Sequence, residues 1–380
     1  MTRKKGFLNS IVNFFRSIFK WLLTRPITAL ANKVSSAPKK EKVMEALSGL
    51  YAQSLDQPGK KSGNMFSFDP LKESVIIFSD QHKGGRNGAD DFAVCEDTYL
   101  AALDYYNSRE FYYVNLGDCE ELWENSIATV MKMNQQCFAK EKLFADRHAY
   151  CKIIGNHDLY WGNDLFAQND IKKMYGREIK IFEGISLRVQ LPAKHFDIFC
   201  THGHQGDAQS DGNWFSKWFV SWIWGPLQSF LEINVNSTSF NDELKTLHNE
   251  MMYEWASQQK NVVLITGHTH QPVFNSLTHL ERLYLKLQEA HEKNDANAVT
   301  AIQAEIPKRR REYDYLNHSF RNMNPSYFNS GCCCFKNGTI TGIEIADDTI
   351  RLIKWELLNG RAVRIVAEET SLSDLGNNIG

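Results

Sequence analysis

Five short apolar segments of this chain each end abruptly in Asp, His or Asn, and this recurrence constrains the fold more than any other feature. The segments are rich in β-branched and aromatic residues, which is typical of buried strands. Stretches with helical spacing lie between several of them. Such alternation predicts an α/β sheet whose strands bring their carboxyl ends to one edge. The expected strands are 74–79, 111–116, 152–154, 196–200 and 261–266, and the expected helices are 90–108, 135–148 and 240–258.

The residues at these strand ends are oxygen and imidazole ligands, which suit hard or borderline divalent metals. They include six of the twelve histidines, far more than random scatter would place there. Thiolates are absent from the set, which argues against a structural zinc site. In chain order the motifs are Asp80-Gln81-His82, Gly117-Asp118, Gly155-Asn156-His157-Asp158, His202-Gly203-His204 and Gly267-His268-Thr269-His270.

The spacing within the motifs favours two adjacent metals. Asp80 and His82 alternate along an extended end and can hold one ion. His268 and His270 can reach two neighbouring ions, and the two oxygens of Asp118 can bridge them. Two such metals would clamp a phosphate and activate a bridging hydroxide for in-line attack.

The ordered set D-x-H, GD, GNHD, HGH and GHTH resembles that of the calcineurin-like metallophosphoesterases, and the resemblance covers most of residues 70–370. It implies a two-sheet β-sandwich flanked by helices, the metallo-dependent phosphatase fold. It also implies that His157 contacts phosphate or protonates the leaving group, oriented by Asp158. The implied metal ligands are Asp80, His82 and His270 for the first ion, Asn156, His202 and His268 for the second, and Asp118 between them.

Within that superfamily, a GD-x-x-E-x-W stretch from Gly117 to Trp123 resembles the UDP-2,3-diacylglucosamine hydrolase branch, which cleaves a pyrophosphate in lipid A precursor synthesis. The segment 202–207 resembles that branch as well. The N-terminal segment and an insertion after the GHTH motif depart from it, so the resemblance leaves the substrate open. His204 is expected either to support the ligands or to contact substrate.

The first 40 residues carry nine Lys and Arg and no acidic residue, and leave 34 basic and 45 acidic residues in the rest of the chain. Residues 7–23 have the spacing of a basic amphipathic helix, which favours binding to an anionic membrane surface. A helix packed on the body and a mitochondrial transit peptide are the alternatives. The expected location is cytoplasmic, with peripheral attachment to membrane.

A tryptophan-rich stretch, 214–224, follows the HGH motif. It is interpreted as an apolar cap beside the metals that receives acyl chains or inserts into the membrane interface, and a helix buried against the domain is the alternative. The expected substrate contacts are Arg86, His204, Trp214, Trp218 and Trp222. The expected organisation is a basic helix and linker (1–40), a short helix and loop (41–66), the catalytic domain (67–370, with the cap at 210–235 and a helical hairpin at 276–320) and a frayed tail (371–380).

The sequence therefore predicts a metallophosphoesterase with two divalent metals, manganese first and iron, zinc or magnesium as alternatives. It would hydrolyse a phosphoester or pyrophosphate, with a lipid-linked substrate favoured. A soluble-substrate phosphatase or nucleotide phosphodiesterase tethered to membrane is one alternative, and a non-catalytic metal-binding scaffold is another. The acidic body argues against specific nucleic-acid binding. The eight cysteines lack zinc spacing and are expected to be buried thiols.

Overall fold

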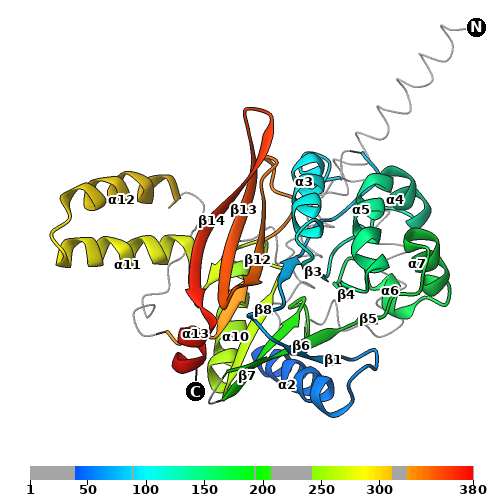
Figure 1. The fold of residues 1–380 in the computed structure, drawn as a ribbon, viewed down its shortest axis with the longest axis horizontal. Helices are drawn as coiled ribbons and strands as arrows, with labels where there is room; N and C mark the ends of the chain where they lie inside the picture. The colour runs from blue at the N-terminus through cyan, green and yellow to red at the C-terminus, as the bar shows by residue number, and fades with distance from the viewer. Residues whose placement is uncertain (1–38, 88–89, 192–193, 207–241, 310–322, 380) are drawn as a thin grey trace, which may run out of the picture.

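The computed structural model describes residues 39–87, 90–191, 194–206, 242–309 and 323–379. These residues form two sheets of seven strands each, with helices packed around them (Figure 1). The predicted α/β two-sheet fold is confirmed. The basic segment before residue 39 and the tryptophan-rich segment within 207–241 lie outside the described residues.

One sheet, here called the β2 sheet, contains the first three predicted strands. β2, β3, β4 and β5 run parallel, and β12, β13 and β14 extend the sheet with antiparallel pairing. In spatial order its strands are β14 (Arg361–Ser371), β13 (Thr349–Leu358), β12 (Ile340–Ala346), β2 (Val75–Phe78), β3 (Tyr112–Leu116), β4 (Tyr150–Ile153) and β5 (Ile181–Phe182).

The other sheet, the β8 sheet, contains the last two predicted strands. β7, β8 and β11 run parallel, so their carboxyl ends also meet at one edge. In spatial order its strands are β1 (Asn64–Phe68), β6 (Gly184–Gln190), β7 (His195–Thr201), β8 (Val262–Thr266), β11 (Tyr327–Asn329), β9 (Val273–Phe274) and β10 (Leu277–Thr278).

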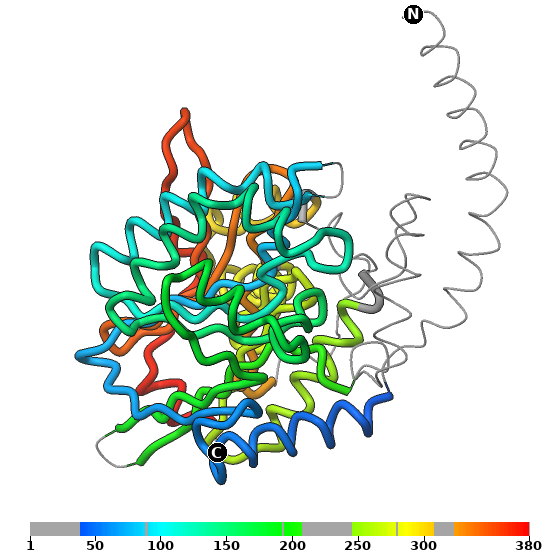
Figure 2. Tube along the Cα trace, turned by 90° about the vertical axis from the view of Figure 1, so that its right-hand side faces the viewer, coloured from blue at the N-terminus to red at the C-terminus, as the bar shows by residue number. Residues whose placement is uncertain are grey.

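The main core lies between the two sheets. Ile77 and Val114 of the β2 sheet belong to the same buried cluster as Ile198 and Val263 of the β8 sheet. Helices α3 (Glu96–Asn107) and α5 (Gln135–Asp146) contribute to the buried cluster on the outer face of the β2 sheet. On the outer face of the β8 sheet, α2 (Lys40–Asp56) runs alongside α10 (Asp242–Gln258) (Figure 2). Helices α4 (Ile127–Met133), α6 (Tyr160–Asn163) and α7 (Ala167–Tyr175) form a further cluster near β4 and β5.

The insertion after the GHTH motif forms two helices, α11 (His279–Glu292) and α12 (Ala296–Arg309), which extend away from the body (Figure 1). A capping box between Thr278 and Glu281 begins α11. Lys286 then forms an ion pair with Glu368 of β14, 2.8 Å between Nζ and Oε1. No helix among the described residues is both long and apolar enough to cross a membrane.

The end of the chain differs from the expected frayed tail. β14 continues to Ser371, and α13 (Leu372–Asn378) follows it directly. Leu372, Leu375 and Ile379 are buried in the core between the sheets, which explains why this segment is ordered. The cysteines, by contrast, match the prediction: all eight lie in the described part and are unpaired, and only Cys151 is not fully buried.

Candidate metal centre

The structure brings the predicted ligands of the first metal together from both sheets. Asp80 and His82 follow β2, and His270 follows β8. His270 Nε2 lies 3.2 Å from Asp80 Oδ1 and 3.2 Å from His82 Nε2. Asp118, which follows β3, is the next neighbour, with Oδ2 at 3.7 Å from His82 Nε2. These separations suit atoms that share a metal ion.

The predicted second group adjoins the first through Asp118. His202, which follows β7, places Nε2 3.2 Å from Asp118 Oδ2. The His202 and His268 rings lie 5.2 Å apart, and both can offer a nitrogen within 4.8 Å of the Asp118 carboxylate. Asn156, which follows β4, is buried at the start of the loop where His157 N donates to Asp118 Oδ1 at 2.8 Å. Asp118 thus lies between the two groups, as a bridging ligand would.

The backbone at these positions is strained. Left-handed φ angles are rare for residues with a side chain and concentrate at functional sites. Backbone hydrogen bonds hold the conformation, since Asp80 N donates to Gly117 O at 3.0 Å and His82 N to Asp118 O at 2.9 Å. Five candidate ligands have such angles: Asp80 (53°), His82 (50°), Asp118 (50°), His268 (69°) and His270 (56°).

Three glycines of the motifs are required by close approach. A Cβ on Gly117 would lie 2.6 Å from His202 Cγ, and its φ of 88° also favours glycine. A Cβ on Gly155 would overlap the Asp118 carboxylate, and one on Gly267 would overlap that of Asp80. Gly117 and Gly267 therefore let loops of the two sheets meet, and Gly155 lets two loops of the β2 sheet meet.

The protonation states of Asp118 and His268 suit metal binding. Burial on its own raises the pKa of Asp118, but His202 and His157 outweigh it and hold the pKa well below its usual range. Burial lowers the pKa of His268 well below its usual range, and the neighbouring His248 and His202 lower it further. Asp118 is therefore a carboxylate and His268 a neutral imidazole, the forms that bind metals. At two other candidate ligands burial alone lowers the pKa, but Asp118 and Asp80 raise the pKa of His202 to about 9, and Cys332 and Asp80 raise the pKa of His270.

Buried atoms without partners test whether the residues fit a metal. Within the described part of the chain, Asn156 Oδ1 and His268 Nε2 are buried and have no hydrogen-bond partner. Leaving such atoms unsatisfied is costly. Asn156 Oδ1 carries lone pairs, His268 Nε2 offers one in the Nδ1–H tautomer, and both residues belong to the second predicted ligand group. The residues present therefore fit a divalent metal.

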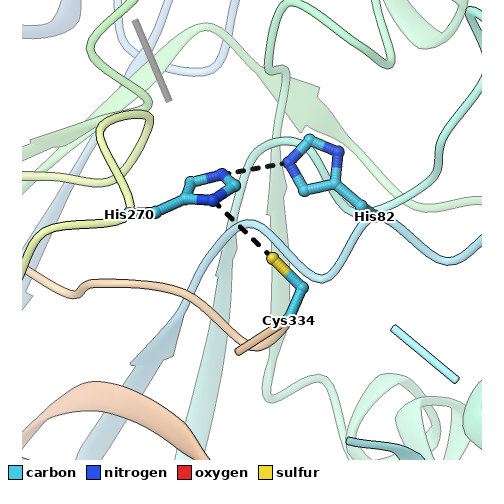
Figure 3. Close-up of side chains that lie close together, drawn as sticks. All are labelled: His82, His270 and Cys334. Carbon is cyan, nitrogen blue, oxygen red and sulfur yellow. Dashed lines mark hydrogen bonds between the residues drawn. The ribbon is translucent and has the colours of Figure 1, made fainter. Parts of the chain in front are cut away.

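Outer partners fix the rings of the candidate ligands. His82 Nδ1 lies 3.0 Å from Glu121 Oε2, and His202 Nδ1 lies 2.9 Å from the carbonyl oxygen of Leu116. His270 Nδ1 lies 3.7 Å from Cys334 Sγ (Figure 3). Each partner occupies Nδ1 and leaves Nε2 for the centre, which is the usual arrangement around metal-bound histidines.

His157 is held by two residues of the GD-x-x-E-x-W stretch. Its Nδ1 lies 2.8 Å from Glu121 Oε2, and its ring stacks on Trp123 at 4.0 Å and 19°. Burial alone lowers the pKa of His157, but the carboxylates of Glu121 and Asp118 outweigh it and raise the pKa to about 9. A cationic imidazole at this position can donate to a phosphate oxygen or a leaving group.

The orienting role expected for Asp158 falls instead to Glu121. The Asp158 carboxylate turns back into its own loop and accepts hydrogen bonds from Gly155 N at 2.6 Å and Cys119 N at 2.8 Å. Because it is fully buried there, it ties the loop after β4 to the loop after β3. Asp158 thus stabilises the loop that carries His157.

The structure brings only some of the expected substrate contacts to the centre. His204 is buried, with its ring 5.4 Å from that of His202. The Arg86 guanidinium forms an ion pair with Glu96 and lies 5.7 Å from the centroid of the Phe92 ring. Trp214, Trp218 and Trp222 lie outside the described residues.

Sequence reasoning missed several residues of this region. Glu121 and Trp123 belong to the GD-x-x-E-x-W motif, which singles them out, but the motif does not predict their contact with His157. His248 of α10 lies behind the centre, with Nε2 2.7 Å from Gly203 O and its ring 5.0 Å from that of His268. For Cys334 the sequence predicts only a buried thiol. Neither His248 nor Cys334 lies in a motif that pointed to the centre.

A buried network of charges lies next to these loops. Lys83 Nζ is 2.5 Å from Glu141 Oε1 and 3.3 Å from Glu120 Oε1. Lys152 Nζ is 2.8 Å from Glu120 Oε2, which also accepts from Trp161 Nε1 at 2.7 Å. The four charged side chains are fully buried, and their charges balance. Lys83 directly follows the candidate ligand His82, and Glu120 lies two residues after Asp118. The network therefore anchors the chain next to both ligands.

A comparison with protein families shows the family of this chain. The family model for calcineurin-like phosphoesterases matches residues 73–272, more than half of the chain, which therefore belongs to that family. Vacuolar protein sorting 29 of Cryptosporidium parvum matches with 12% identity, a TM-score of 0.30, and coverage of 79% of this chain and 98% of that one. A single mutant of Vps29 from Entamoeba histolytica matches with 12% identity, a TM-score of 0.30, and coverage of 78% and 99%. A comparison with curated protein sequences gave no match.

Proposed function

We propose that this chain is a metal-dependent hydrolase of phosphoester or pyrophosphate bonds with two divalent metals, manganese being the first choice. The observation that carries the proposal is the convergence of carboxylate, amide and imidazole ligands from five strand ends beside a histidine fixed by Glu121 and Trp123. Asp80, His82 and His270 would hold one metal, Asn156, His202 and His268 the other, and Asp118 both.

When bound, such metals polarise the phosphoryl group and lower the pKa of water so that it can attack phosphorus. The chain's own residues supply the remaining steps. The Glu121 carboxylate forms an ion pair with His157 at Nδ1, which leaves Nε2 for the substrate. Nε2–H would donate to a phosphate oxygen and then to the departing oxygen. Stacking on Trp123 restricts ring rotation, which lowers the entropic cost of that donation.

The test is hydrolysis of bis-p-nitrophenyl phosphate by protein stripped of metal and then supplied with Mn²⁺. We expect activity only with Mn²⁺, and a loss of about 10²- to 10⁴-fold in His157→Gln, the usual contribution of a general acid. The variant should bind metal like the wild type, because His157 is not among the proposed ligands. Metal binding without hydrolysis of any phosphoester would favour the alternative of a non-catalytic scaffold.

We further propose that the substrate is linked to a lipid and that the enzyme acts at an anionic membrane surface. The support comes from the sequence: the basic amphipathic residues 7–23, the tryptophan-rich stretch 214–224, and the GD-x-x-E-x-W stretch that resembles UDP-2,3-diacylglucosamine hydrolases. Comparing a UDP-diacylglucosamine-type lipid in detergent with the soluble diester tests this proposal. Preference for the soluble diester would instead indicate a phosphatase or nucleotide phosphodiesterase that is only tethered to membrane.

A further inference from the structure

Three consecutive cysteines follow β11, and the structure gives them different surroundings. Cys333 is fully buried in the cluster that contains Phe78 and Cys95, on the outer side of the β2 sheet. Cys334 faces the candidate metal centre, where its Sγ lies 3.7 Å from His270 Nδ1 (Figure 3). Only 7% of Cys334 is exposed, so solvent cannot readily replace the sulfur as a partner of the ring.

The backbone holds this segment firmly against the metal-binding loops. Cys333 N donates to the carbonyl oxygen of Asp80 at 3.1 Å. Cys332 N donates to Thr341 Oγ1 at 3.2 Å, and Thr341 N donates back to Cys332 O at 3.0 Å. These bonds fix the main chain immediately before Cys334 and so restrict where its sulfur can lie.

The two nitrogens of His270 face different groups. Nε2 faces Asp80 and His82, each at 3.2 Å, and Nδ1 faces Cys334. The Cys332 side chain also hydrogen-bonds both His270 and Cys334, so Cys334 is held between the ring and a second thiol. His82 and His202 make the same division, but their Nδ1 atoms face oxygens. Sulfur therefore takes the place that a carboxylate or carbonyl oxygen takes at the other two rings.

We propose that Cys334 is a positioning residue that orients His270 toward the first metal by accepting the Nδ1 hydrogen. The inference rests on the proposed two-metal centre and adds to it a sulfur atom outside the ligand set. Loss of such an outer partner weakens metal binding by about 10- to 100-fold. The effect is confined to the first metal, because the proposed ligands of the second one have other partners.

Titration of the metal-stripped full-length protein with Co²⁺, followed by calorimetry and visible absorption, tests this role. In Cys334→Ala one of two Co²⁺ ions should bind about 10- to 100-fold more weakly while the other is unchanged. Cys334→Ser keeps an acceptor and should recover most of the loss. Cys333→Ala is the matched control, since it removes a neighbouring buried sulfur that faces away from His270.

The unchanged ion shows that a variant is folded, so a weaker first site cannot be ascribed to unfolding. Wild-type affinity for both ions in Cys334→Ala would overturn the inference. A sulfur-to-cobalt charge-transfer band that disappears in Cys334→Ala would also overturn it, because the sulfur would then coordinate the metal directly. A wild-type protein that binds no Co²⁺ would overturn both the inference and the proposed function. Bound Co²⁺ with no phosphoester hydrolysis would count against the proposed function alone.

Discussion

Replacing Glu120 by Gln should destabilise the protein strongly, because it unbalances the buried charge network. The carboxylate lies 2.8 Å from Lys152 Nζ and 3.3 Å from Lys83 Nζ, and all three side chains are fully buried. Gln keeps the shape and can still accept from Trp161, but it removes the negative charge. Lys83 then stays paired with Glu141, whereas Lys152 loses the carboxylate with which it forms its ion pair.

The magnitude follows from these distances. With an effective dielectric constant of about 20, the two ion pairs are worth about 6 and 5 kcal/mol. The several kcal/mol that burying a carboxylate costs offset much of this attraction. A net loss of about 3–5 kcal/mol in the free energy of unfolding is expected, as for other buried pairs that lose one partner.

Urea denaturation of the metal-free protein measures the loss in the free energy of unfolding. Two further variants test whether charge balance is its cause. Glu120→Gln combined with Lys152→Met leaves Lys83 paired with Glu141, so the double variant should regain most of the lost stability. Asp146→Asn breaks an exposed ion pair with Lys142 and should cost about 0.3–0.5 kcal/mol. If Glu120→Gln costs less than about 1 kcal/mol, or the double variant is no better than the single one, charge balance is not what this network provides.

Three further predictions concern the centre and the N-terminal segment. Asp118→Asn should abolish Mn²⁺-dependent hydrolysis and weaken binding of both metals with little change in the circular dichroism spectrum, and normal turnover would contradict the bridging role. Gly155→Ala should weaken metal binding and cost about 1–3 kcal/mol of stability, because its Cβ overlaps the Asp118 carboxylate; unchanged metal affinity would show that the loop can shift. Deleting residues 1–25 should release the protein from anionic vesicles in a sedimentation assay while hydrolysis of the soluble diester is retained, and vesicle binding that persists would assign attachment to another segment.

The sequence predicted the site best where an apolar strand pattern and a metal-binding residue type occur in the same short segment. Asp80 and Asp118 could be singled out because each directly follows an apolar run, and the strand ends did converge. Which side chain turns toward which neighbour could not be read in the same way. Glu121 rather than Asp158 pairs with His157, because loop side-chain directions depend on φ and ψ angles, which a residue pattern does not specify.

Contacts between distant segments were also beyond the sequence. His248 reaches Gly203 from a helix 45 residues away, and Cys334 reaches His270 across 64 residues. β12 pairs with β2 although most of the chain separates them. The short helix α13 carries only two buried leucines, Leu372 and Leu375, too few to give a periodic signal. In each case the contact depends on how the two sheets and their helices pack, which local sequence does not specify.

The origin of the ligands in two sheets has a consequence for assembly. Asp80, Asp118 and Asn156 follow strands of the β2 sheet, whereas His202 and His268 follow strands of the β8 sheet. A chain in which only one sheet has formed offers an incomplete ligand set. Metal binding would therefore stabilise the assembled sandwich by about 2.7 kcal/mol per site at a metal concentration of a hundred times the dissociation constant. States in which only one sheet has formed would not gain this stabilisation.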